Sequence, residues 1–150
     1  MELKKENSLI GIYIHVPFCE KKCPYCDFYS VNNNESMMDI YTDAVCLSIK
    51  NWSTKIKKEV DTIYFGGGTP SLIGEIRLSK IIKTISKYFV LKNPEITIEI
   101  NPTKGKLLDF YYLKELGINR LSVGLQSIHK NELKILGRSH DNNDAKALIS

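Results

Sequence analysis

The 150-residue chain has no long hydrophobic run, since its apolar stretches all fall short of the roughly 18 consecutive residues of a transmembrane helix. Residues 1–7 are mainly polar and contain no apolar segment of the signal-peptide kind. The net charge of +4 is small, and lysines such as Lys55, Lys57 and Lys58 are scattered as on a solvated helix face, so nucleic acid is not expected as a partner. We therefore predict a cytoplasmic protein without an integral membrane segment.

Cysteine is scarce as well, and it is unevenly distributed. The chain holds four cysteines, and three of them, Cys19, Cys23 and Cys26, fall within eight residues. Thiols stay reduced in the cytosol, so clustered cysteines there indicate metal or redox chemistry rather than a disulfide framework. Thiolates at such close spacing favour zinc or an iron–sulfur cluster.

A fourth cysteine is missing from this loop. A structural zinc site needs about four protein ligands, and His15 and Cys46 are the candidates for the fourth. However, zinc ligands usually come as two separated pairs, and a free cysteine flanked by apolar residues, as Cys46 is, most often belongs to the core. A zinc-binding module is therefore the distant alternative. Three thiolates leave one iron of a cluster without a protein ligand, so that this iron can bind a small chelating molecule. This favours a reactive site over a purely structural one.

Two periodicities alternate along the chain. A two-residue period indicates strands, and apolar residues spaced three and four apart indicate amphipathic helices. We expect strands at 10–16, 62–65, 95–100 and 119–125, and helices at 36–52, 78–89 and 104–116, then a short helix ending near Gly137 and another in the last ten residues. Strands separated by helices form βα units, which predicts a parallel sheet with helices packed on it.

Each predicted strand has one aliphatic face and one polar face. Parallel strands buried on both faces read as continuous aliphatic runs, so the polar face indicates a cavity that holds something polar. An open barrel around a ligand fits this pattern, and functional groups of such barrels lie at the C-terminal ends of the strands. The polar face carries Tyr13, His15, Thr62, Tyr64, Thr97, Glu99, Ser122, Gly124 and Gln126.

The four predicted strands are about half of the eight that close a barrel of this type. We therefore expect residues 1–150 to be the N-terminal part of a longer protein, or a truncated reading frame. The last strand would then have an unpaired edge, and the chain alone would tend to self-associate.

Five short segments resemble those of a known family. The spacing C-x3-C-x2-C, with Tyr25 just before the last cysteine, resembles the cluster loop of the radical S-adenosylmethionine superfamily. A glycine-rich turn follows a strand about 40 residues later. In order, YIHVPFC, YFGGGTPS, EINP, LSVGLQS and LGRSH resemble the branch that contains oxygen-independent coproporphyrinogen III oxidase and its relative, the haem chaperone. The resemblance covers nearly the whole chain.

The resemblance implies an α/β fold: a partial (β/α) barrel of parallel strands with outer helices, of which about half is present. It implies that Cys19, Cys23 and Cys26 bind a 4Fe–4S cluster. In this family the amino and carboxylate groups of S-adenosylmethionine chelate the open iron. One electron from the reduced cluster then cleaves the sulfonium and gives a 5'-deoxyadenosyl radical.

The resemblance also implies cofactor-binding residues. Those that correspond to the cluster-bound S-adenosylmethionine site are Tyr13, Tyr25, Gly67 and Glu99, and those that resemble the surroundings of a second S-adenosylmethionine in the oxidase are Gly68, Thr69, Gln126 and Arg138. Each has a structural alternative. Tyr13 could belong to the core, Glu99 could form an ion pair facing the helices, and Arg138 could be a surface cation. His15 is expected to be a structural histidine, hydrogen-bonded near the cysteine loop.

Phe28 bears on the choice between chaperone and oxidase. The oxidase loop continues to a fourth cysteine two residues past the third, where this chain has Phe28. The ending C-D-F resembles the chaperone, which binds haem as cargo and delivers it to haem proteins. The resemblance thus implies haem, haem-accepting proteins and an electron donor such as flavodoxin or ferredoxin as partners. The alternative is an enzyme that oxidatively decarboxylates coproporphyrinogen III, with a porphyrinogen as its ligand, so catalytic activity stays open.

Overall fold

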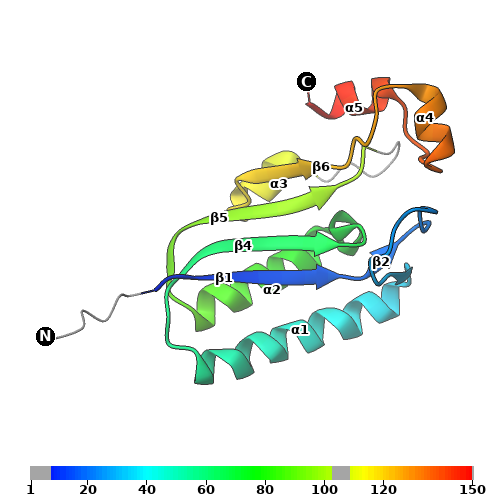
Figure 1. Cartoon of the computed structure of the whole chain (residues 1–150). Helices are drawn as coiled ribbons and strands as arrows, with labels where there is room; N and C mark the ends of the chain where they lie inside the picture. The colour runs from blue at the N-terminus through cyan, green and yellow to red at the C-terminus, as the bar shows by residue number, and fades with distance from the viewer. Residues whose placement is uncertain (1–7, 103–108, 150) are drawn as a thin grey trace, which may run out of the picture.

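The computed structural model describes residues 8–102 and 109–149. Its centre is a sheet of four parallel strands in the spatial order β1-β4-β5-β6, whose arrows point the same way in Figure 1. The strands are β1 (Ile10–Val16), β4 (Val60–Gly67), β5 (Leu91–Ile100) and β6 (Arg120–Val123). The predicted parallel sheet is confirmed.

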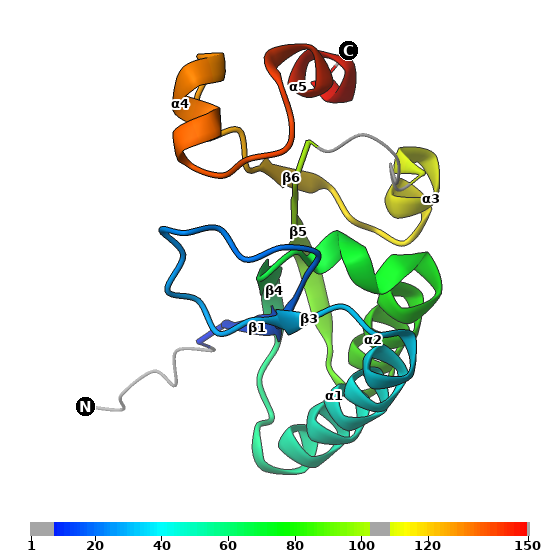
Figure 2. The ribbon, with the colours of Figure 1, turned by 90° about the vertical axis from the view of Figure 1, so that its right-hand side faces the viewer.

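Helices connect the strands and cover one face of the sheet. Figure 2 shows two long helices side by side on that face. These are α1 (Glu35–Lys55) and α2 (Gly74–Tyr88); α3 (Phe110–Glu115) precedes β6, and α4 (Lys130–Ile135) and α5 (Asn142–Ile149) follow it. None of these described helices is long and apolar enough to cross a membrane.

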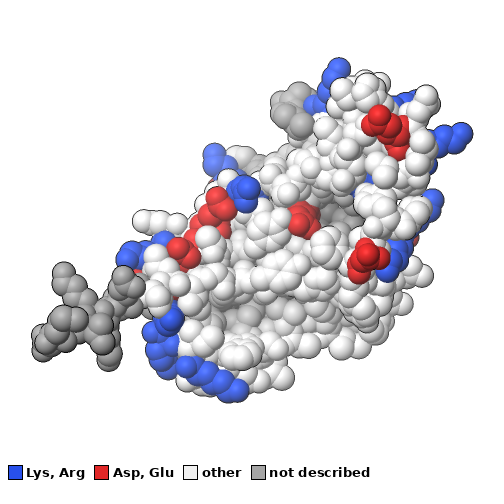
Figure 3. All heavy atoms as spheres, viewed as in Figure 1, with Lys and Arg blue, Asp and Glu red and all other residues white. Residues whose placement is uncertain are grey.

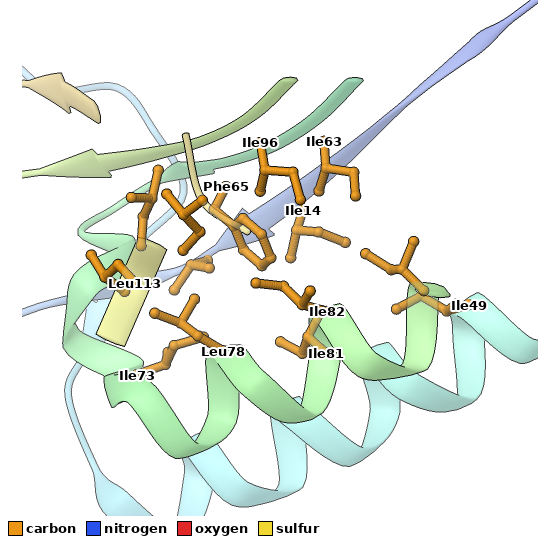
Figure 4. Close-up of a cluster of buried hydrophobic side chains, with 14 of the residues drawn as sticks. Ile14, Ile49, Ile63, Phe65, Ile73, Leu78, Ile81, Ile82, Ile96 and Leu113 are labelled. Atoms are coloured by element: carbon orange, nitrogen blue, oxygen red, sulfur yellow. The ribbon is translucent and has the colours of Figure 1, made fainter. Parts of the chain in front are cut away.

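The strand register aligns the aliphatic side chains into one layer. Ile14 pairs with Phe65, and Phe65 pairs with Ile98, and all three are buried. Side chains from strands and helices meet in this layer (Figure 4), where the labelled residues are Ile14, Ile49, Ile63, Phe65, Ile73, Leu78, Ile81, Ile82, Ile96 and Leu113. Burial of this apolar surface supplies the main favourable free energy of folding. The aliphatic face of the strands packs against the helices, which confirms the prediction.

The opposite face of the sheet is polar, as predicted. On it the rings of Tyr13 and Tyr64 stack with centroids 6.0 Å apart, and Glu99 pairs with Ser122 across β5 and β6. Figure 2 shows the loop that carries the cysteines on this side, away from α1 and α2. The arrangement leaves the polar face available to a ligand.

Some elements differ from their predicted bounds. Phe18–Cys19 (β2) and Val31–Asn32 (β3) form a two-residue parallel pair that no periodicity predicted, because two residues are too few to show one. Pro70–Ile73 forms a 3-10 turn, and α2 starts right after it, at Gly74 rather than at residue 78. The first part of the predicted helix 104–116 lies outside the described residues.

Two isoleucines of α2 provide a matched test of this packing. Ile81 has no exposed surface, whereas Ile76 is 85% exposed. We expect Ile81→Ala to lower the free energy of unfolding by about 2–5 kcal/mol, because it leaves a cavity between helix and sheet. Ile76→Ala should change it by no more than about 0.5 kcal/mol. Denaturant unfolding measures both values, and equal losses would contradict the packing described.

Candidate functional site

The cysteine loop begins and ends at the C-terminal edge of the sheet. The backbone N–H of Val31 donates to the carbonyl of Pro17 at 2.7 Å, and that of Asn33 donates to Cys19 at 3.2 Å. Inside the loop, the N–H of Cys26 donates to the carbonyl of Cys23 at 3.1 Å. These bonds anchor both ends of the loop, so its cysteines are held beside the ends of the strands.

A pocket of about 310 Å³ lies at this edge. Its walls come from the cysteine loop, from the ends of β4, β5 and β6, and from the segment after α4, and Figure 3 shows this face hollowed, with basic and acidic side chains around the hollow. The predicted site residues that line it are Cys19, Cys23, Tyr25, Cys26, Gly67, Gly68, Thr69, Glu99, Gln126 and Arg138. Residues far apart in the sequence are therefore brought together as expected.

Tyr13 is the predicted site residue that does not line this pocket. Its side chain is 57% exposed, so it is not a core residue either. The hydroxyl lies 3.1 Å from Nδ1 of His15, and the ring stacks on Tyr64. Burial and, to a smaller extent, the negative charge of Glu99 raise the pKa of Tyr13.

His15 makes structural hydrogen bonds beside the loop. Its Nε2 lies 3.1 Å from the carbonyl oxygen of Tyr29, and its Nδ1 faces the Tyr13 hydroxyl. A carbonyl only accepts, so Nε2 donates to it, and Nδ1 shares its hydrogen bond with the Tyr13 hydroxyl. The structural role predicted for His15 is confirmed, and neither nitrogen is left to serve as the fourth ligand of a zinc ion.

Cys46 does not belong to the pocket. It lies on α1 against α2, where the hydroxyl of Thr84 donates to its sulfur at 3.3 Å. Within residues 8–102 and 109–149, no three His, Cys, Asp or Glu side chains are arranged as a ready metal-binding group. The three loop cysteines, by contrast, all line the same pocket.

Glu99 lies on the polar face, so it is not an ion-pair partner on the helical side. Its Oε1 accepts from the hydroxyl of Tyr64 at 2.7 Å, and its Oε2 accepts from the N–H of Gly67 at 3.2 Å. The hydrogen bond to Glu99, together with burial, raises the pKa of Tyr64. Sequence reasoning did not select Tyr64 as a site residue, although it placed Tyr64 on the polar face.

The glycine turn after β4 approaches the cysteine loop closely. A Cβ atom on Gly68 would lie 2.6 Å from the carbonyl oxygen of Phe18 and 2.9 Å from Sγ of Cys19. Gly67 has a φ of 116°, and a Cβ there would lie 2.8 Å from the His15 ring. Both positions therefore require glycine, because only a residue without a side chain allows this contact and this backbone angle.

Arg138 enters the pocket from the end of α4. That helix ends in a Schellman motif, in which Gly137 has a φ of 67° and the N–H of Arg138 donates to Leu133 at 2.9 Å. The Nη1 atom of Arg138 lies 3.5 Å from Sγ of Cys23. Its Nε is buried and has no hydrogen-bond partner among the described residues. Arg138 is thus a pocket residue and not a surface cation.

The turn after β6 holds Gln126 in a left-handed conformation. Gln126 has a φ of 64°, which is uncommon for a residue with a side chain and costs about 1–3 kcal/mol. Buried His140 supports the turn, since its Nε2 lies 3.1 Å from the carbonyl oxygen of Leu125. Such strain persists only where the surrounding structure imposes it, and here it places Gln126 in the pocket lining.

The chain thus combines a parallel α/β sheet with a three-cysteine loop and a glycine turn at the C-terminal edge of that sheet. The sequence matches the family described as the radical SAM superfamily over residues 13–150. The chain belongs to this superfamily. The match confirms the predicted family, and similarity to a solved structure, given below, confirms the predicted partial barrel fold.

Similar proteins within this superfamily are more specific. The chain is 39% identical to "Heme chaperone HemW" of Buchnera aphidicola subsp. Schizaphis graminum, over 91% of this chain and 37% of the relative. It is 36% identical to "Heme chaperone HemW" of Escherichia coli, over 91% of this chain and 37% of the relative. The chain therefore spans little more than a third of the length of these curated relatives.

A solved structure is also similar. "Coproporphyrinogen III oxidase (HemN) from Escherichia coli is a Radical SAM enzyme" describes a structure that matches with a TM-score of 0.86 and 27% identity. The match covers 97% of this chain and 35% of that one. The two kinds of relative correspond to the two functions that the resemblance left open.

Two glycines at equivalent helix ends test the contact between α4 and the cysteine loop. Gly117 and Gly137 both end helices with a positive φ, of 87° and 67°. A Cβ on Gly137 would lie 2.9 Å from Cδ of Pro24, whereas on Gly117 its nearest neighbour would be 3.6 Å away. Gly117→Ala should lower the free energy of unfolding by about 1–2 kcal/mol, because of the backbone angle alone. Gly137→Ala should lower it further, because the added Cβ would also meet Pro24. Equal losses in denaturant unfolding would show that the cysteine loop does not pack against Gly137.

Proposed function

We propose that Cys19, Cys23 and Cys26 bind a 4Fe–4S cluster and that the adjoining pocket binds S-adenosylmethionine. The observation that carries this proposal is the presence of all three thiols and the glycine turn in the lining of one pocket. The donor set fits the group, because thiolates are the usual ligands of iron–sulfur clusters. When bound, the cluster supplies the single electron that cleaves the sulfonium of S-adenosylmethionine.

The pocket residues would position this ligand. Tyr64 and Gly67 each hold one oxygen of the Glu99 carboxylate, which fixes its orientation and leaves further lone pairs to accept from hydroxyl groups of a nucleoside. Tyr25 lies in the pocket lining, with its side chain partly exposed. The buried part of the side chain raises the pKa of Tyr25, and the positive charge of Arg138 opposes this rise. Its phenol therefore stays neutral at physiological pH.

For the whole protein we propose the function of a haem chaperone. The relatives named "Heme chaperone HemW" support it, and so does Phe28. That side chain lines the pocket and is 61% exposed, and a phenyl ring offers neither a thiolate ligand nor a redox-active sulfur. We propose haem as cargo, haem-accepting proteins as partners, flavodoxin or ferredoxin as electron donor, and the cytoplasm as the location.

Oxidation of coproporphyrinogen III is the second candidate. Two observations favour it: the structural similarity to HemN, and the position of Gly68, Thr69, Gln126 and Arg138 in the pocket lining. Loss of two carboxylates needs two successive radical events, and these four residues resemble the surroundings of the second S-adenosylmethionine in the oxidase.

Anaerobic reconstitution with iron and sulfide tests the cluster. The chain should bind about four irons with matching acid-labile sulfide and gain a broad visible absorbance band. Cys23→Ala should lose both, because it removes one of three protein ligands. Cys46→Ala is the matched control and should keep both, since that sulfur lies between α1 and α2. Stoichiometric zinc without bound sulfide would refute the proposal.

A second assay separates chaperone from oxidase. The protein that contains this chain is incubated anaerobically with coproporphyrinogen III, S-adenosylmethionine and a reductant, and haem is titrated in parallel. A chaperone should form a stable haem complex, transfer haem to an apo-haem protein and leave coproporphyrinogen III unchanged. Multiple turnovers to protoporphyrinogen IX, without a stable haem complex, would establish the oxidase function instead.

A further inference from the structure

A chain of hydrogen bonds joins two of the three cysteines across the pocket. Arg138 donates from Nη1 to Sγ of Cys23 at 3.5 Å and from Nη2 to Oδ1 of Asn101 at 2.9 Å. Asn101 in turn donates from Nδ2 to Oγ1 of Thr69 at 3.1 Å, and the Thr69 hydroxyl lies 3.9 Å from Sγ of Cys19. Asn101 is the central member, and its hydrogen bonds in this chain go to Arg138 and Thr69 rather than to a sulfur.

Arg138 can only donate, so it fixes the orientation of the Asn101 amide, and that amide in turn fixes the direction of the hydrogen bond to Thr69. The amide oxygen accepts from the guanidinium of Arg138, and the amide nitrogen donates to the hydroxyl oxygen of Thr69. A hydroxyl that accepts from an amide keeps its own proton free to point elsewhere, here toward Cys19. Only a side chain with both a donor and an acceptor can hold the two neighbours in this way.

The surrounding backbone leaves space for these contacts. Arg138 also donates from Nη2 to the carbonyl oxygen of Gly124 at 2.6 Å. A Cβ on Gly124 would lie 2.9 Å from Oδ1 of Asn101 and 3.0 Å from Nη2 of Arg138. Glycine at this position therefore allows the guanidinium and the amide to meet above the strand ends.

Hydrogen bonds and positive charge at cysteine sulfurs affect the electron affinity of a cluster. Reduction adds a negative charge to the cluster and its thiolates, so a guanidinium next to one sulfur and a hydroxyl proton directed at another stabilise the reduced form. In a partly buried site this electrostatic effect is larger than in water. A residue that holds both donors in place thus raises the reduction potential without being a ligand.

We infer that Asn101 is a positioning residue that raises the reduction potential of the cluster by holding Arg138 against Cys23 and Thr69 against Cys19. The inference rests on the proposed function, because it requires a cluster on these cysteines. It goes further by giving a role to a side chain outside the set of site residues predicted from the sequence.

The test is the midpoint potential of the reconstituted cluster, followed by electron paramagnetic resonance during a redox titration. Asn101→Ala should shift it to more negative values by at least a tenfold change in the reduction equilibrium, about 59 mV for a one-electron couple. Asn119→Ala is the matched control. Like Asn101, Asn119 uses both amide atoms: its Nδ2 donates to the carbonyl oxygen of Pro94, and its Oδ1 accepts from the N–H of Ile96. These contacts lie at the opposite end of the strands from the pocket. The Asn119→Ala variant should therefore leave the midpoint potential unchanged.

Gly124→Ala provides a second, independent variant, since it crowds Asn101 and Arg138 without removing a polar group. It should shift the potential in the same direction as Asn101→Ala, with about four irons still bound. Iron content and the free energy of unfolding are measured for each variant. A cluster-loaded Asn101→Ala protein with an unchanged potential would overturn the inference, as would a shift of the same size in Asn119→Ala. Absence of a cluster from the unmodified chain would instead refute the proposed function.

Discussion

The close approach of the glycine turn to the cysteine loop is the contact on which the site depends. The N–H groups of Gly68 and Thr69 donate to the carbonyls of Val16 and Phe18, both at 2.8 Å, and thus continue the pairing of β1 with β4 beyond the strands. A side chain at Gly68 would separate the two segments. Backbone bonds alone therefore place Cys19 against the end of the sheet, and the other pocket residues are arranged around that position.

The parallel sheet explains how the pocket obtains its side chains. Each βα unit returns the chain to the same edge, so each strand end adds polar groups at one place. The turn after β4 contributes Thr69, the end of β5 contributes Glu99 and Asn101, and the turn after β6 contributes Gln126. The helices need to cover only the aliphatic face, which leaves the polar face free for this accumulation.

Much of this arrangement could be predicted from the sequence, because alternation along strands and glycine before a turn are local signals. The polar face with Glu99 and Gln126 follows from them, whereas the other cofactor-binding residues of the pocket, such as Gly68, Thr69 and Arg138, were implied by the family resemblance. The hydrogen-bond chain through Asn101 could not be predicted, since it joins residues 37 and 32 positions apart, and its geometry depends on how α4 ends. Tyr13 lies outside the pocket lining because its register puts it opposite Tyr64, three residue pairs before the last pair of β1 and β4, Val16 and Gly67.

The charges around the pocket agree with the chemistry of its thiols. Its lining contains three basic side chains, Lys21, Lys22 and Arg138, and one glutamate, Glu99, whose carboxylate is already held by Tyr64 and Gly67. Three thiolates in one pocket would repel one another, and nearby cations reduce that repulsion. The two lysines are exposed to solvent, whereas Arg138 is held by the end of α4 and by Asn101. Because solvent screens exposed charges more strongly than partly buried ones, Arg138 is the cation of the lining that acts most strongly on the electron affinity of a bound group.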